Sequence, residues 1–178
     1  MLPSAQVKRI YVLRHGKSDW SSEYAADHDR PLKGRGVRAA RLMGRFLAAT
    51  GREPDVVVSS SAVRAITTAR LAAEAGNWGC DVRVEPSLYG ASRARVLQEI
   101  RSLDATIDSV LVAGHQPTCS DVVGSLIGSA EIRFPTAAMA CIDVPTARWD
   151  AVEFGRGFLV WLVTPKLLAG AGFHGGQR

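Results

Sequence analysis

Arg14 and His15 stand directly after an apolar run, residues 10–13, whose length suits a β-strand. Open α/β sheets bind their ligands at the carboxyl ends of the strands, which is where this pair falls. The guanidinium of an arginine can hold a phosphate through two parallel hydrogen bonds, and a neutral imidazole can attack phosphorus. An isolated pair of this kind could also serve only to solvate a strand end. Its residue types nevertheless predict phosphoryl-transfer chemistry with His15 as the nucleophile.

A second arginine lies near the start of a predicted helix. Residues 55–58 predict a short buried strand, and the serines at 59–61 predict a turn into a helix that extends to about Gly76. Arg64 therefore falls in the first turn of this helix. Unpaired backbone N–H groups and the helix dipole already favour an anion at that position, and Arg64 adds a full positive charge.

A second histidine follows another buried strand, predicted over residues 109–113. This strand brings His115 and Gln116 to the sheet edge that carries His15. Neighbouring positive charges lower the pKa of an imidazole, so we expect His15 to be neutral and able to attack. We expect His115 to be protonated and to donate to a phosphate oxygen, after which water would hydrolyse the phospho-His15 intermediate.

The sequence indicates no metal ion and no other cofactor for this reaction. It has no HExxH pattern, and Asp19, Asp27 and Asp29 do not match the spacing of an EF-hand loop. The two remaining histidines, His28 and His174, are interpreted as solvated residues of a loop and of the C-terminal tail. We therefore expect a metal-independent phosphatase.

The elements that position these residues alternate between strand-like and helix-like periods. This alternation predicts a three-layer α/β/α fold with a mostly parallel central sheet. The polar stretch 18–33 is a loop long enough to reach over the site. We expect one catalytic domain over residues 1–168, followed by a flexible Gly-rich tail over 169–178. The other predicted elements are a helix from Gly36 that stops at Gly51, helices over 92–103 and 118–127, and strands over 81–84, 138–144 and 158–163.

Composition is consistent with a compact enzyme. The chain has 178 residues, 47% of them hydrophobic, which suits one domain able to bury a core. Its longest apolar stretch near the C-terminus, residues 158–163, is far shorter than the roughly 20 residues that span a bilayer. Residues 1–9 lack the hydrophobic segment of a signal peptide. We therefore expect a cytoplasmic protein without a membrane partner.

Charge and cysteine content argue against two further classes of protein. The net charge is +5, but the basic residues are scattered, with no basic run and little aromatic interleaving, so we expect no nucleic-acid partner. Cys80, Cys119 and Cys141 are odd in number and lack CxxC spacing, which favours free thiols over a disulfide framework or a zinc site. Nothing in the composition indicates an oligomeric state.

Three blocks of the sequence resemble the histidine phosphatase superfamily, which has the phosphoglycerate mutase-like fold. The run Arg14-His15-Gly16-Lys17-Ser18 is similar to the signature in which the histidine is transiently phosphorylated. Residues 59–69 resemble the second block, and this implies that Arg64 binds the phosphoryl group. Residues 110–117 resemble the third block, and this implies that His115 faces the nucleophile across the phosphate.

Within the superfamily, the sequence most resembles the small phosphohistidine phosphatases of the SixA type. The features that carry this likeness are Arg30-Pro31-Leu32, Leu88-Tyr89-Gly90-Ala91 and Trp161-Leu162-Val163-Thr164-Pro165. The resemblance extends from about residue 10 to about residue 168.

Two positions depart from the pattern of the larger superfamily members. Those members carry an asparagine that contacts phosphate where this chain has Ser21, whose hydroxyl is the corresponding candidate. They also carry an acid that protonates the leaving oxygen, in a block before a Tyr-Gly pair. Here Pro86 takes that offset from Tyr89, so Glu85, one residue earlier, is a candidate acid whose alternative interpretation is a surface residue after a strand.

Glu85 matches only weakly the acid that protonates the leaving oxygen in larger superfamily members, and this affects which substrate we expect. An alkoxide leaving group needs a proton in the transition state, whereas an imidazole, whose conjugate acid has a pKa of about 6.5, leaves with little help. The short chain between Arg64 and His115 leaves little room for a cap, so the site is open to a protein surface. We therefore expect a phosphorylated protein as substrate, for example a phosphorelay carrier. Alternatives are a small phosphorylated ligand hydrolysed at the same site and a phospho-ligand binding module without turnover.

Overall fold

A computed structural model of the chain describes residues 6–175 and contains a single six-stranded sheet. The strand order is β3-β2-β4-β1-β5-β6, in which β1 to β4 are parallel and β5 and β6 run antiparallel to their neighbours. The strands are β1 (Lys8–Arg14), β2 (Val56–Ser60), β3 (Val82–Glu85), β4 (Ser109–Gly114), β5 (Met139–Val144) and β6 (Phe158–Val163). The predicted fold class is therefore confirmed.

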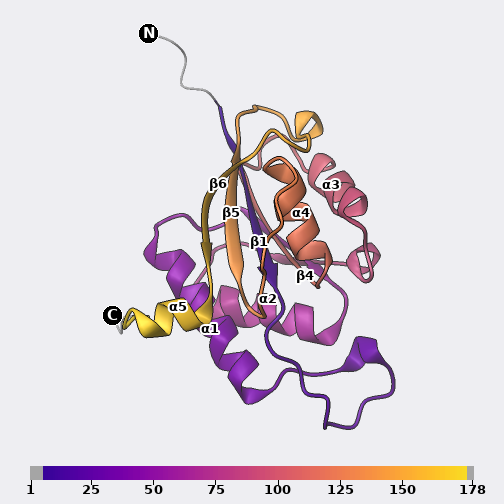
Figure 1. The fold of residues 1–178 in the computed structure, drawn as a ribbon, viewed down its shortest axis with the longest axis vertical. Helices are drawn as coiled ribbons and strands as arrows, with labels where there is room; N and C mark the ends of the chain where they lie inside the picture. Colours follow the sequence, from indigo (N-terminus) through magenta and orange to yellow (C-terminus); the bar gives the residue numbers. More distant parts are fainter. Residues whose placement is uncertain (1–5, 176–178) are drawn as a thin grey trace.

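Helices cover both faces of the sheet, which makes three layers (Figure 1). The α-helices are α1 (Gly34–Ala49), α2 (Val63–Gly76), α3 (Arg93–Arg101), α4 (Thr118–Leu126) and α5 (Pro165–Gly170). Three single turns of 3-10 helix, which the sequence analysis did not predict, are η1 (Asp27–Asp29), η2 (Pro86–Leu88) and η3 (Trp149–Ala151). The first helix begins two residues earlier than predicted, and Gly51 after it has a φ of +66°, which suits the predicted stop.

Alternation along β1 divides the core into two clusters. Ile10 and Val12 point to one face and pack with α3 and α4, whereas Tyr11 and Leu13 point to the other and pack with α1, α2 and α5. All four side chains are at most 2% exposed, as expected for a strand buried on both faces. Because β1 lies between β4 and β5, its carboxyl end is fixed from both sides.

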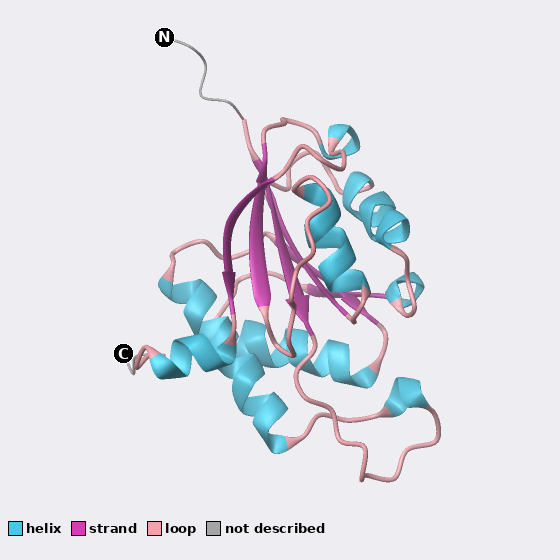
Figure 2. Ribbon diagram, viewed as in Figure 1, coloured by secondary structure: helices cyan, strands magenta, loops and turns pink. Residues whose placement is uncertain are grey.

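The segment between β1 and α1 is an irregular loop, residues 15–33, whose two ends are held together (Figure 2). Asp19 N–H donates to the carbonyl of Pro31 at 2.8 Å, and Lys33 N–H donates to the carbonyl of Lys17 at 2.8 Å. Glycine is needed where α1 meets this loop, because a Cβ on Gly36 would lie 2.3 Å from the oxygen of Lys17. The close approach anchors the loop beside the end of β1.

The predicted tail, residues 169–178, begins inside α5. Phe173 contacts Phe46 of α1 edge to face, with ring centroids 6.0 Å apart. Residues 176–178 of the predicted tail, and residues 1–5 at the start of the predicted domain, lie outside the described residues.

Candidate active site

His15 lies at the carboxyl end of β1, and its backbone continues the sheet for one more residue. Its N–H donates to the carbonyl of Gly114 at 3.0 Å, and its carbonyl accepts from Ala137 N–H at 3.1 Å. The imidazole is buried, and its Nδ1 lies 2.7 Å from the carbonyl oxygen of Gly16. Since a carbonyl can only accept, this contact requires a proton on Nδ1 and leaves the lone pair of a neutral ring on Nε2. The geometry therefore prepares Nε2 to act as a nucleophile.

The pKa of His15 is lowered from its ordinary value to about 4. Burial is the main cause, and the positive charges of Arg64, Arg14 and Arg30 lower it further against the opposing hydrogen bond to Gly16. The ring is consequently neutral near pH 7, as the sequence analysis expects.

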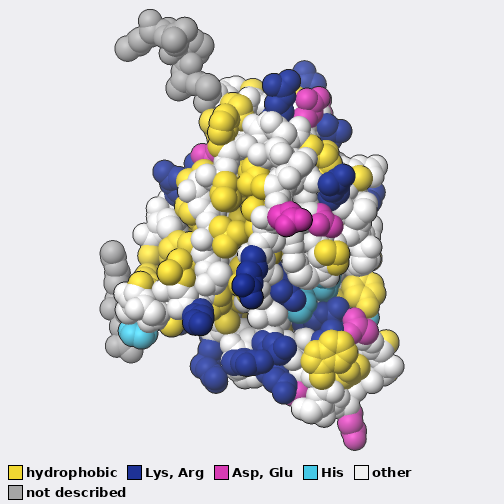
Figure 3. Space-filling view, viewed as in Figure 1, with side chains coloured by type: hydrophobic (Ala, Val, Ile, Leu, Met, Phe, Trp, Pro, Cys, Tyr) yellow, Lys and Arg dark blue, Asp and Glu magenta, His cyan; other side chains and the backbone are white. Residues whose placement is uncertain are grey.

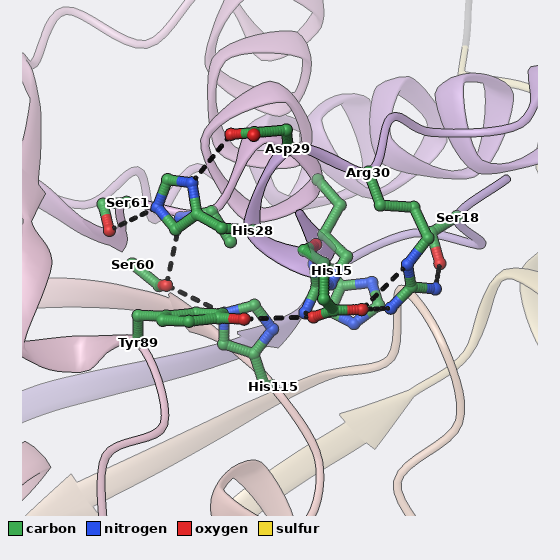
Figure 4. Close-up of polar contacts among 12 residues, drawn as sticks. His15, Ser18, His28, Asp29, Arg30, Ser60, Ser61, Tyr89 and His115 are labelled. Atoms are coloured by element: carbon green, nitrogen blue, oxygen red, sulfur yellow. Dashed lines mark hydrogen bonds and ion pairs between the residues drawn. The ribbon is translucent and has the colours of Figure 1, made fainter. Parts of the chain in front are cut away.

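His115, at the end of β4, faces His15 with ring centroids 5.2 Å apart (Figure 4). Its Nε2 lies 2.8 Å from the hydroxyl of Ser60. Burial, followed by the proximity of His15 and Arg64, lowers its pKa to about 3. These effects favour a neutral His115, because the cost of burying a charge among cations exceeds the attraction of Asp27. The expected protonated form, which donates to a phosphate oxygen, stays a prediction for the complex with phosphate.

Arg14 and Arg64 direct their guanidinium groups to the same region. Arg14 donates to the carbonyl of Phe134 at 2.9 Å, and Arg64, in the first turn of α2, donates to the carbonyl of Asp27 at 2.6 Å. Within residues 6–175, three buried site atoms have no hydrogen-bond partner: Nε of Arg14, Nε of Arg64 and Nδ1 of His115. Buried polar groups are usually paired, so unpaired groups gathered in one place suit a ligand that accepts hydrogen bonds.

Asp27 is a site residue that the sequence analysis missed. Its carboxylate accepts from Arg64 at 2.9 Å, from Arg30 at 2.8 Å and from the hydroxyl of Tyr89 at 3.1 Å. Burial acts to raise its pKa, but the hydrogen bond from Arg30 and the charge of Arg64 outweigh burial, so the pKa is lowered. Asp27 thereby ties the loop to α2 and keeps the Arg64 side chain at the site. The sequence predicted a loop over residues 18–33 that could reach the site, but nothing in it singled out Asp27.

His28 also belongs to the surroundings of the site and is not the freely solvated residue that the sequence suggested. Its Nε2 lies 2.9 Å from the hydroxyl of Ser61 and its Nδ1 lies 3.2 Å from Asp29 (Figure 4). The ring meets Tyr89 edge to face at 5.0 Å, and Tyr89 meets His115 in the same way at 5.7 Å. The loop is thus connected to His115 through the aromatic ring of Tyr89.

The three remaining candidates make local contacts. Ser21 is exposed and donates from its hydroxyl to Asp19 at 2.6 Å. The amide of Gln116 contacts the hydroxyl and the N–H of Ser120, and Gln116 lines with His115 a groove of about 550 Å³. Glu85 accepts from Ser87 N–H at 3.0 Å, and hydrogen bonding to Ser87 lowers its pKa. Over residues 6–175, none of these three side chains forms a hydrogen bond with the two arginines or the two histidines.

Three further features of the described residues bear on the reaction and its setting. Over residues 6–175, no group of three or more His, Cys, Asp or Glu side chains is placed to bind a metal ion. The three cysteines are free. In the same part of the chain, none of the helices combines the length and hydropathy that crossing a bilayer requires.

The burial of two neutral imidazoles makes the stability of the fold depend on pH. Their pKa values are about 4 and 3 in the folded protein, against about 6.5 when unfolded, so only the unfolded chain takes up protons as the pH falls below 6.5. We expect the free energy of unfolding to fall by roughly 2 kcal/mol per imidazole between pH 7 and pH 5. Urea unfolding at both pH values, with His115→Gln as the comparison, measures this loss. Equal losses in the wild type and in His115→Gln would contradict the assignment to His115.

Comparison with known proteins places these residues in a family context. The family model of the histidine phosphatase superfamily (branch 1) matches residues 10–92, a stretch that contains Arg14, His15 and Arg64. An uncharacterized protein of Mycobacterium tuberculosis is 35% identical over 166 residues, which cover 86% of this chain and 100% of that protein.

Two solved structures share both the fold and detectable sequence similarity. The protein histidine phosphatase SixA complexed with tungstate superposes with a TM-score of 0.78 at 26% identity, covering 90% of this chain and 99% of that one. A SixA-type protein of Agrobacterium tumefaciens gives a TM-score of 0.76 at 27% identity, covering 89% and 98%.

Proposed function

Because the chain belongs to the histidine phosphatase superfamily, we propose that it is a phosphatase that removes phosphoryl groups from histidine on proteins through a phospho-His15 intermediate. In the first step, the lone pair on Nε2 of His15 attacks phosphorus while the bond from phosphorus to the substrate imidazole breaks. The substrate imidazole, protonated on its other nitrogen, leaves as a neutral ring. In the second step, water attacks phosphorus, the bond to His15 breaks, and inorganic phosphate leaves.

The positive groups of the site support the transfer itself. Phosphoryl transfer depends mainly on positioning and on stabilising the charge of the equatorial oxygens. Among the described residues, Nε of Arg14 and Nε of Arg64 have no partner, and a terminal nitrogen of each guanidinium donates to a backbone carbonyl. A phosphoryl dianion would raise the pKa of the nearby His115, which could then donate to an oxygen of that dianion. The hydrogen bond from Nδ1 of His15 to Gly16 would stabilise the positive ring of the intermediate.

The protonation state of two carboxyl groups, those of Asp27 and Glu85, is the observation on which the proposed substrate class rests. Asp27 and Glu85 both have lowered pKa values, so neither holds a proton for a leaving group near neutral pH. A phosphate monoester needs such a proton because its alkoxide is a poor leaving group, whereas a phosphohistidine does not. This observation favours phosphohistidine over monoesters.

A preference for phosphohistidine is the expected result of a direct comparison. We expect kcat/KM for a phosphohistidine peptide to exceed that for phosphate monoesters by at least ~100-fold, because general acid catalysis contributes about 10²–10⁴ to the rates of reactions that need it. Phosphate release from the peptide and from a panel of sugar phosphates and nucleotides measures the ratio. A monoester hydrolysed faster than the peptide would overturn the substrate assignment and make Glu85→Gln the next variant.

A small-molecule phosphatase is the second candidate function, favoured by two contacts. The loop over residues 15–33 reaches Tyr89 through both Asp27 and His28, which narrows the opening of the site on that side. A narrower opening suits a small ligand better than a protein surface. The same substrate panel separates the two candidates.

A further inference from the structure

A groove of about 640 Å³ opens between the start of α1, the segment before β5 and the start of α5. Four of its lining residues are basic, namely Lys17, Arg35, Arg133 and Lys166, and none is acidic. Figure 3 shows Lys and Arg side chains gathered in the lower part of one face, near the histidines. We call this feature the cationic groove, defined by the four basic residues.

The cations of the groove are not neutralised by the part of the chain that the structure describes. Across residues 6–175, none of the four side chains takes part in an ion pair or a hydrogen bond, whereas Arg9, Arg30, Arg64 and Arg95 are all paired with carboxylates. Lys17 is half-buried and the other three are exposed. Four unpaired like charges around one depression repel one another and create a positive potential that attracts anions.

The cationic groove adjoins the phosphoryl-binding residues through neighbouring positions of the chain. Lys17 follows His15 by two positions, so their Cα atoms lie within ~7 Å of each other. The wall that contains Arg133 continues into Phe134, whose carbonyl accepts from Arg14, and then into Ala137, whose N–H donates to the carbonyl of His15. An extended ligand with its phosphoryl group on His15 can therefore continue into the groove.

We propose that the cationic groove binds acidic residues of the protein that carries the phosphohistidine. This proposal rests on the proposed function and names the chemistry of its partner. The basic residues come from four separate segments and are spread along an open depression, which fits a run of Asp and Glu side chains better than one compact phosphate. Of the residues that the structure describes, no aromatic one lines the groove, so this lining lacks the stacking surfaces that single-stranded nucleic acids use.

Charge reversal in the groove tests the proposal without touching the reaction centre. Arg35 and Lys166 are the second residues of α1 and α5, where a carboxylate is favourable for the helix, so Arg35→Glu/Lys166→Glu is expected to fold. The matched control, Arg52→Glu/Arg83→Glu, makes the same change in net charge at exposed residues that do not line the groove. The substrates are two phosphohistidine peptides of equal length, one flanked by Glu and the other by Gln.

We expect the groove variant to lose roughly tenfold in kcat/KM on the Glu-flanked peptide, mainly through KM. Its kcat/KM on the Gln-flanked peptide and on p-nitrophenyl phosphate should equal that of the wild type. The control variant should keep the wild-type kcat/KM on both peptides and on p-nitrophenyl phosphate. Wild-type preference for the Glu-flanked peptide should also weaken as salt is raised. Equal effects on both peptides, or no effect on either, would overturn the docking proposal.

Binding measured without turnover separates this proposal from the proposed function. Fluorescence anisotropy with the unphosphorylated Glu-flanked peptide should show weaker binding to the groove variant than to the control. If neither phosphohistidine peptide is hydrolysed, the proposed function fails, while this binding difference still decides the docking proposal. If an oligothymidylate of equal charge bound more tightly than the Glu-flanked peptide, the docking proposal would be overturned in favour of nucleic acid. If a compact bisphosphate bound more tightly than this peptide, it would be overturned in favour of a small ligand.

Discussion

His15→Ala is expected to lower kcat/KM at least ~10⁴-fold, because removal of a nucleophile ends the covalent route and leaves only binding and charge stabilisation. The expectation rests on the geometry of one ring, in which the hydrogen bond from Nδ1 to Gly16 leaves the lone pair on Nε2 and burial keeps that lone pair unprotonated. Phosphate release from a phosphohistidine peptide measures the loss. In the wild type, brief incubation with ³²P-labelled peptide should leave label on the protein that survives alkali and is lost in acid.

His174→Ala is the matched control, since it removes an exposed imidazole far along the chain from β1. It should keep wild-type activity and wild-type labelling. Turnover in His15→Ala at the wild-type rate would exclude the phospho-His15 mechanism. A wild type that binds phosphopeptide but neither turns over nor becomes labelled would instead identify the site as a phospho-ligand binding module.

The residues at the ends of β1, β4 and α2 could be predicted because each depends on a local pattern. A buried strand is a short apolar run, and the residue after it falls at the sheet edge whatever the rest of the chain does. Arg14, His15 and His115 were placed by this argument, Arg64 was placed by the pattern of a turn followed by a helix, and the structure brings the four together. The antiparallel pairing of β5 with β1 and β6 was not predicted, because the periodicity of a strand does not contain its direction.

Asp27 and His28 could not be found in the same way, since their roles depend on where an irregular loop folds back. A polar residue in a polar loop looks the same in sequence whether it faces water or Arg64. The neutral form of His115 that the structure favours could not be predicted from the sequence for a related reason. Its charge state depends on burial beside His15, and neither burial nor the 5.2 Å separation of the rings is encoded locally.

Arg64→Ala is expected to lower kcat about 10³-fold with a smaller change in KM, because the charge it neutralises develops most fully in the transition state. Arg64 is only 5% exposed, and its Nε is unpaired within residues 6–175. Steady-state kinetics on the phosphohistidine peptide give the two constants separately. Titration with vanadate, which mimics the trigonal-bipyramidal transition state, should show a loss of affinity that parallels the loss of kcat.

Two comparison variants separate the chemical role of Arg64 from its structural contacts with Asp27. Arg70→Ala removes an exposed arginine from the same helix and should keep wild-type kinetics. Arg64→Lys keeps one positive charge but cannot contact both Asp27 and a phosphoryl oxygen through a planar fork, so we expect only partial activity. If Arg64→Ala raised KM and left kcat unchanged, Arg64 would bind substrate and transition state equally. Its main contribution would then be to hold the loop over residues 15–33 in place through Asp27.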